Sequence, residues 1–117
     1  MTPFGSKIRE LRAGRGLSLK QMAADLQVSS AYLSALEHGR RGRPSPNLVR
    51  QICGYLDIIW DEAEALQRLA RLSHPRVTID TAGLSPTHTE LANLLAERIG
   101  NLSEARAEKL VAALITE

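Results

Sequence analysis

The strongest constraint on the fold is a series of short segments in which apolar residues recur every three or four positions. Glycine, serine and proline separate these segments, and serines stand ahead of three of them, where a hydroxyl can accept a hydrogen bond from a free amide of the first helical turn. The apolar spacing predicts helices over residues 4–14, 18–26, 29–38 and 45–56. Short amphipathic helices in close succession predict an all-α fold.

Local signals predict where these helices begin and end. Ser18 and Gln21 have the spacing of a capping box, in which two side chains bond each other's backbone amides. Gly39 suits the left-handed residue that ends a helix, and Ser45-Pro46 matches an N-cap followed by a first-turn proline. The helices over 18–26 and 29–38 are therefore expected to meet across a tight turn.

The pattern changes in the second half of the chain. Residues 60–72 again have helical spacing, with acidic residues first and arginines last, which matches the helix dipole. Residues 76–80 have an alternating pattern rich in β-branched side chains, which is typical of a short strand. Since nothing else in the chain resembles a strand, this segment either pairs with its counterpart in a second subunit or is an extended linker.

Two further helices are expected near the end, over residues 86–99 and 102–115, with Asn101 and Glu104 spaced as a capping box between them. A helical pair of this size buries too little apolar surface alone to offset the entropy of ordering it. We therefore expect it to dock on the first half of the chain or on a partner, and we favour a second copy as that partner.

Composition narrows the classes of function. The chain has 117 residues, 44% of them hydrophobic, but one Phe, one Trp and two Tyr, so its core must be aliphatic. Cys53 is the single cysteine and excludes an internal disulfide, and the three histidines are dispersed without metal-ligand spacing. Neither a nucleophile signature nor an apolar stretch of ~20 residues is present. We expect a cytoplasmic protein with no metal, cofactor, membrane span or enzymatic activity.

Charge is distributed unequally along the chain. Residues 1–58 carry nine Lys and Arg against four Asp and Glu, a net +5, whereas residues 59–117 carry six against nine, a net −3. A basic half predicts a polyanionic partner such as nucleic acid. Alternatively, the basic charge only keeps a small domain soluble and binds no partner.

A set of residues in the first half is ordered and spaced as in a known family. Its members are Ile8, Leu11, Arg12, Gly16, Leu17, Ser18, Met22, Ala23, Leu26, Val28, Ser29, Leu33, Ser34, Leu36, Glu37, Gly39, Arg40, Arg41, Pro44, Leu56, Asp57 and Ile58. Together they resemble the helix-turn-helix family of the lambda repressor and Cro, the Xre family. The resemblance implies a lambda repressor-like domain of about five helices over residues 1–72 that binds double-stranded DNA. Residues 73–117 would then hold an extended segment and two helices that join subunits.

The resemblance implies that the helix over 29–38 enters the major groove, which is ~12 Å wide and admits one helix. The residues expected nearest the base edges are Ser30, Ala31, Tyr32, Ser34 and Ala35. The family often has Gln, Asn or Arg here, and Leu19 stands where it often has a phosphate-binding Gln. Because Ser and Ala discriminate bases weakly, we expect DNA shape to supply much of the sequence preference.

Contacts to the DNA backbone are expected on both sides of that helix. The candidate residues are Ser18, Lys20, Ser29, Arg40, Arg41 and Arg43. Alternatively, the three arginines lie in a solvated loop and do not contact DNA. Arg12 and Glu37 match positions that form an ion pair in the resembling family, so we expect them to fix the angle of the recognition helix.

These features predict a transcriptional regulator, a repressor, that binds an inverted-repeat operator as a homodimer. The residues expected to join the subunits are Val77, Ile79, Leu91, Leu94, Leu95, Ile99, Leu110 and Leu114. The alternative is an antitoxin or adaptor that binds a protein partner through its C-terminal half. Enrichment of one site from random DNA favours the regulator, and a stable heteromeric complex favours the alternative.

Overall fold

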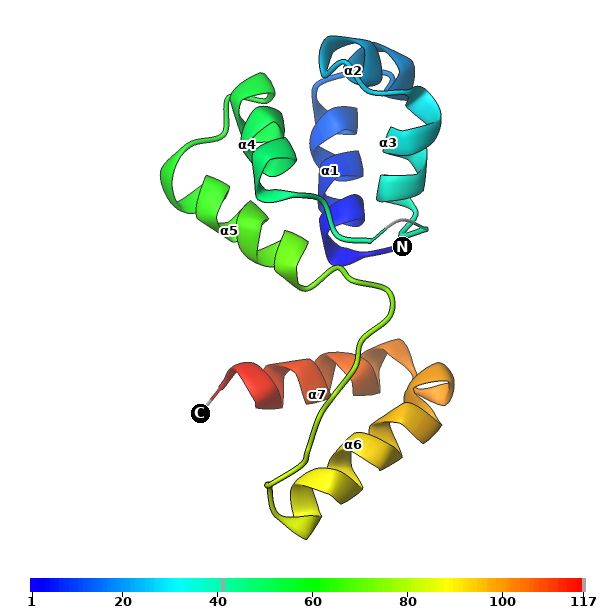
Figure 1. Cartoon of the computed structure of the whole chain (residues 1–117). Helices are drawn as coiled ribbons and strands as arrows, with labels where there is room; N and C mark the ends of the chain where they lie inside the picture. Colours follow the sequence, from blue (N-terminus) through cyan, green and yellow to red (C-terminus); the bar gives the residue numbers. More distant parts are fainter. Residues whose placement is uncertain (41, 117) are drawn as a thin grey trace. The chain divides into compact units, whose positions relative to one another are not determined.

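The computed structural model describes residues 1–40 and 42–116, which form seven α-helices and one 3₁₀ helix and contain no β-strand (Figure 1). The predicted all-α class is confirmed. The chain divides into two compact units, Met1–Val77 and Thr78–Glu117. Among the described residues, none of the helices combines the length and the apolarity needed to cross a bilayer.

The first unit contains five helices: α1 (Pro3–Gly14), α2 (Leu19–Asp25), α3 (Ser30–Glu37), α4 (Pro46–Tyr55) and α5 (Trp60–Arg71). All five were predicted, because serine caps and apolar spacing are local signals. The hydroxyls of Ser18, Ser29 and Ser45 each accept a hydrogen bond from the amide three residues ahead. Gly39 follows α3 with a φ of +74°, the left-handed conformation expected for it.

One predicted capping box in this unit is only half formed. Ser18 caps α2, but the Gln21 side chain does not return the bond to the Ser18 amide. Its amide nitrogen donates instead to Asp25, one turn ahead on the same helix, at 2.9 Å. An i,i+4 partner on the helix surface therefore competes with the reciprocal half of a capping box.

The core of the first unit is aliphatic apart from Phe4, and all five helices contribute to it. Its buried members are Phe4, Ile8, Met22, Ala23, Leu33, Leu36, Leu48, Val49, Ile52, Cys53, Leu56, Ile58, Leu66 and Ala70. Helix α1 packs against both α3 and α5, while α2 packs against α3 and α4 against α5 (Figure 1). The position of α3 therefore depends on α1 and α2.

Two close contacts fix α1 to its neighbours. A Cβ on Gly5 would lie 2.2 Å from the carbonyl oxygen of Glu37, so the backbones of α1 and α3 touch at this glycine. At the other contact, the buried Ser73 hydroxyl accepts a hydrogen bond from the Phe4 amide at 2.9 Å. The first unit therefore continues beyond the end of α5.

The second unit contains α6 (Pro86–Arg98), the 3₁₀ helix η1 (Ile99–Asn101) and α7 (Glu104–Ile115). The predicted cap at Asn101 is wrong, because that residue belongs to η1 and the hydroxyl of Ser103 caps α7 by accepting from the Arg106 amide. No residue of 78–116 is buried. Residues 76–80 form no ladder within the described chain, and their pairing between subunits stays a prediction.

Candidate nucleic-acid interface

Helix α3 has a buried side and a polar, small-residue side. Leu33, Leu36 and Glu37 are buried against the rest of the unit. The five residues predicted to face the bases lie on this one helix: Ser30 and Ala31 are exposed, and Tyr32, Ser34 and Ala35 are partly buried. Since the two most exposed residues occupy its first turn, the N-terminal part of α3 is best placed to approach a partner.

An ion pair between Arg12 and Glu37 holds the C-terminal end of α3 against α1. The Arg12 Nε lies 3.0 Å from Glu37 Oε2, and its Nη2 donates to Oε1 at 3.2 Å. The Glu37 side chain is 2% exposed and that of Arg12 16%. The third nitrogen of Arg12 donates to the Leu17 carbonyl at 3.0 Å, in the loop before α2. Such a two-point, charge-assisted bond restrains the direction of α3 as well as its distance from α1.

The predicted phosphate contacts before α3 are exposed side chains at helix starts. Ser18 and Ser29 cap α2 and α3 by accepting amide hydrogen bonds of 3.0 Å from Gln21 and Tyr32. A serine hydroxyl that accepts one bond still has a proton to donate. Ser18, Ser29 and Lys20 are all exposed. Each side chain can therefore offer a proton to an external anion without giving up its role in the fold.

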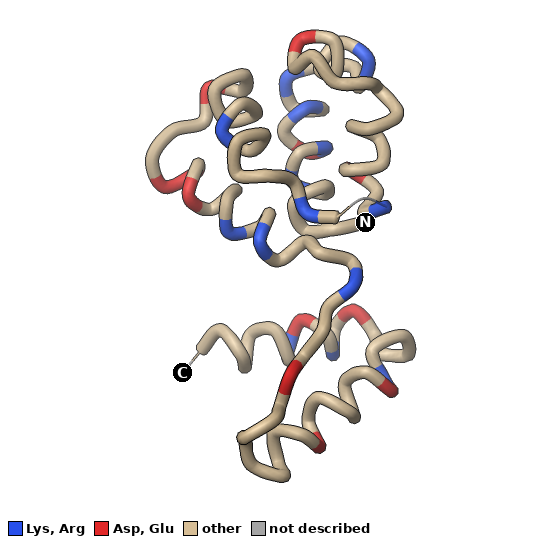
Figure 2. The backbone as a smooth tube through the Cα atoms, in the orientation of Figure 1, with Lys and Arg blue, Asp and Glu red and all other residues tan. Residues whose placement is uncertain are grey.

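The predicted arginine clamp lies in the loop after α3. Arg40 and Arg43 are exposed, whereas Arg41 lies outside the described residues. At the end of α3, His38 Nδ1 lies 2.8 Å from the Ser34 carbonyl oxygen. Residues 1–77 carry twelve Lys and Arg against seven Asp and Glu, a net +5. Figure 2 shows basic residues of this unit on α1, around α2, in the loop after α3 and also on α4 and α5.

A polar cluster that the sequence analysis missed ties α2 to α4. The Tyr55 hydroxyl donates a hydrogen bond to Asp25, which also accepts from Gln21. The bond from Tyr55 and then that from Gln21 lower the pKa of Asp25, and the bond to the carboxylate raises the pKa of Tyr55. Asp25 and Tyr55 are thirty residues apart, so their meeting depends on the tertiary fold.

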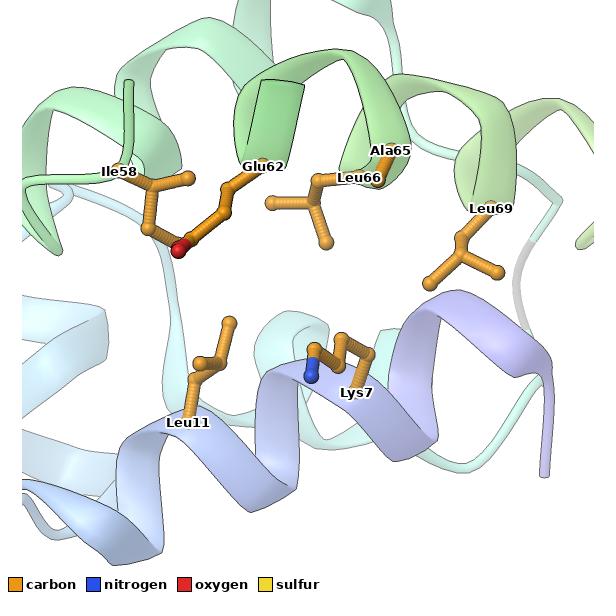
Figure 3. A pocket seen from close by; sticks show the side chains of 7 residues that line it. All are labelled: Lys7, Leu11, Ile58, Glu62, Ala65, Leu66 and Leu69. Carbon is orange, nitrogen blue, oxygen red and sulfur yellow. The ribbon is translucent and has the colours of Figure 1, made fainter. Parts of the chain in front are cut away.

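A mainly apolar hollow lies between α1 and α5. It measures about 330 Å³ (Figure 3), with the lining residues Lys7, Leu11, Ile58, Glu62, Ala65, Leu66 and Leu69. Its lysine pairs at 3.6 Å with Glu10 on the same helix. Among the described residues, no three metal-ligating side chains come together. Burial raises the pKa of the Cys53 thiol, as expected of a core residue.

Gly5 and Ser73 set the packing around α1, and neither was predicted from the sequence. A glycine early in a helix carried no signal of its own, because its role appears only when the Glu37 backbone is beside it. Ser73 follows α5 directly, where a serine also suits an ordinary loop. Both positions act through contacts distant in sequence.

Taken together, two short helices joined by a tight turn, the second braced from behind and presenting small polar residues, define a helix-turn-helix unit. The chain belongs to the helix-turn-helix domain family, which matches residues 3–66. This match confirms the helix-turn-helix domain predicted from the sequence.

Several curated proteins are similar to the chain. The HTH-type transcriptional regulator RghRB of Bacillus subtilis is 37% identical over 65 residues, which cover 56% of this chain and 47% of that protein. The HTH-type transcriptional repressor RghR of the same organism is 36% identical over 61 residues, covering 52% and 45%.

The transcriptional regulator ClgR of Mycobacterium tuberculosis is 32% identical over 74 residues, covering 59% of this chain and 65% of that protein. The chain thus spans about half the length of the Bacillus relatives it matches. No solved structure matches the chain significantly.

Proposed function

We propose that this chain is a sequence-specific DNA-binding transcriptional regulator, a repressor, that binds an inverted-repeat operator as a homodimer. The observation that carries the proposal is the outer face of α3, where Ser30 and Ala31 are exposed in the first turn while the Arg12–Glu37 ion pair holds the other end of the helix against α1. A major groove admits one α-helix, and small outer side chains let the helix backbone approach the base edges closely.

In this proposal the first turn of α3 contacts the bases. Ser30 and Ala31 reach deepest, with Tyr32, Ser34 and Ala35 beside them. Serine hydroxyls accept or donate equally well and alanine senses only a thymine methyl, so direct discrimination is modest. The remaining preference comes from the groove width and flexibility of the DNA.

Backbone contacts supply most of the affinity. Arg40 and Arg43 neutralise phosphates on one side of α3, together with Arg41. On the other side, Lys20 adds a charge, and Ser18 and Ser29 donate their hydroxyl protons to phosphate oxygens. Each neutralised phosphate releases condensed counterions, so the affinity should fall steeply as salt rises.

A homodimer follows from the geometry of DNA. Two recognition helices on one face of a duplex must be about one turn, ~34 Å, apart, which a twofold dimer provides. The residues proposed to join the subunits are Val77, Ile79, Leu91, Leu94, Leu95, Ile99, Leu110 and Leu114. Repression is supported by the similarity to the RghR repressor.

The direct test is selection of binding sites from random DNA at stated salt, with the size of the complex measured. We expect one inverted repeat to be enriched and bound by two copies. Replacing Arg40 and Arg43 by alanine should weaken binding to every sequence and flatten the slope of log K against log salt by about four, because a dimer carries two copies of each arginine. Replacing the exposed Arg50 and Arg68 removes the same charge from α4 and α5 and is the matched control.

Two results would contradict the proposal. Failure to enrich any sequence would show that α3 does not read DNA. An equal loss of affinity in both double variants would show that net charge, not the loop after α3, binds the phosphates.

A further inference from the structure

The second unit has apolar stripes that its own fold leaves uncovered. Seven large apolar side chains of α6, η1 and α7 are between 42% and 73% exposed: Leu91, Leu94, Ile99, Leu110, Val111, Leu114 and Ile115. Contacts within the unit are concentrated between α6 and the adjoining η1. Isolated helices of 12 or 13 residues are marginal in water, so α6 and α7 need a cover over these side chains to persist.

The width of the apolar stripes indicates how many further helices must pack against α6 and α7. On α7, the apolar residues from Ala107 to Ile115 recur at i, i+3, i+4, i+7 and i+8, the pattern of a helix that faces a core. Leu91, Leu94 and Leu95 begin a similar stripe on α6. A stripe this wide contacts more than one neighbour, and α6 and α7 supply at most one neighbour to each other. Two more amphipathic helices complete a four-helix bundle.

A second copy of the unit supplies those two helices with the same apolar area. Seven half-exposed Leu, Ile and Val side chains offer on the order of 100 Å² each, or about 700 Å² per copy. Two copies would bury about 1,400 Å², within the roughly 1,200–2,000 Å² of stable interfaces. A twofold contact is self-complementary, so one stripe serves both copies.

We propose that α6 and α7 become ordered only by pairing with α6 and α7 of a second copy, so that folding of residues 78–116 and dimerisation are one transition. The inference rests on the homodimer of the proposed function and adds how that homodimer is regulated. At low protein concentration the second unit is unfolded and each helix-turn-helix unit meets DNA alone. Above the dimer dissociation constant the second unit folds and two units bind together. DNA occupancy then rises more steeply than linearly with protein concentration.

Helix content measured against protein concentration tests the coupling in the full chain. Helices α6 and α7 hold 25 of the 74 α-helical residues described, so dissociation should remove about one third of the helical circular dichroism. We expect this loss to follow the fraction of dimer measured by sedimentation at the same concentrations.

A pair of variants separates the stripe from general effects of charge. Leu114→Glu places a carboxylate in the stripe at a side chain that is 73% exposed, so the isolated unit loses little packing. It should weaken dimerisation at least tenfold and shift the helix transition to the same higher concentration. Ala113→Glu adds the same charge to the neighbouring exposed position outside the stripe and should leave both unchanged.

Three results would overturn the proposal. A dimer that dissociates with no loss of helix overturns the coupling but leaves the dimeric regulator. A chain that stays monomeric with constant, full helix content shows that the stripes are covered within one copy, and it overturns both the coupling and the homodimer. A monomer that lacks the helices at every concentration shows that a second copy does not order them, and it also overturns the coupling and the homodimer. Selection from random DNA tests DNA binding separately from all three.

Discussion

Substituting Gly5 by alanine tests whether the contact between α1 and α3 sets the position of α3. The added Cβ would lie 2.2 Å from the Glu37 carbonyl oxygen, 2.7 Å from its carbonyl carbon and 2.8 Å from its Cα. These are backbone atoms, so a rotamer change cannot relieve the overlap. Ordinary contact begins at 3.4 Å, so α3 must move by about 1 Å.

Two effects of opposite sign determine the change in stability. Alanine is favoured over glycine in a helix by at most about 1 kcal/mol. Inserting a methyl group into a filled contact costs about 1–3 kcal/mol. Moving Glu37 also stretches its two bonds to Arg12, which adds to the cost. We expect a net destabilisation of about 1–2 kcal/mol, or a fall in melting temperature of roughly 5–15 °C.

Gly14→Ala is the matched control on the same helix. A Cβ there meets nothing within 4 Å, so this variant should be as stable as the parent or up to about 1 kcal/mol more stable. Thermal unfolding of both variants, followed by binding to a selected DNA site, gives the comparison. Only Gly5→Ala should lose affinity, by about tenfold or more, because only this change displaces α3. A Gly5→Ala protein as stable as the parent would refute the close approach of α1 and α3.

Three further predictions concern single side chains. Arg12→Ala leaves the Glu37 carboxylate 2% exposed and unpaired, so the free energy of unfolding measured in urea should fall by about 3 kcal/mol. Tyr55→Phe removes the main hydrogen bond that lowers the pKa of Asp25, so an NMR titration should show that pKa rising toward its ordinary value. The Cys53 thiol is 7% exposed and its pKa is raised, so a thiol reagent should modify the folded chain on the order of 100-fold more slowly than the unfolded chain.

The Asp25 prediction has a definite dependence on pH. Because the pKa of Asp25 is lower in the folded state, its stabilising contribution is present above the unfolded pKa and is lost as the pH falls through the folded one. The stability difference between the parent and Tyr55→Phe should therefore shrink in acid. A difference that stays constant from neutral pH to below the folded pKa would show that Tyr55 acts through packing alone.

The helices of the first unit could be predicted because their signals are local. Ser18, Ser29 and Ser45 act on amides within one turn, and the apolar spacing needs no knowledge of the partner helix. The errors arose where a side chain had a competing neighbour. Gln21 binds Asp25 instead of the helix start, and the 3₁₀ turn moves the cap of α7 from Asn101 to Ser103.

The contacts that position α3 were harder to predict. The spacing of Arg12 and Glu37 alone does not bring them together, and only the family resemblance indicated their pairing. Gly5, Ser73 and the contact between Asp25 and Tyr55 carried no signal, because each depends on segments distant in sequence. Residues 86–99 and 102–115 were predicted as helices with apolar stripes, but a sequence pattern indicates only the stripe and not what covers it.

The most direct test of the central claim is a change of specificity at Ala31, an exposed residue in the first turn of α3. Selection from random DNA is carried out in parallel with the parent and with Ala31→Asn, whose amide can bond an adenine edge. Our account predicts an inverted repeat for both proteins, with one base pair changed in each half-site for the variant. The same preferred site bound with the same affinity by both proteins would show that α3 does not face the bases.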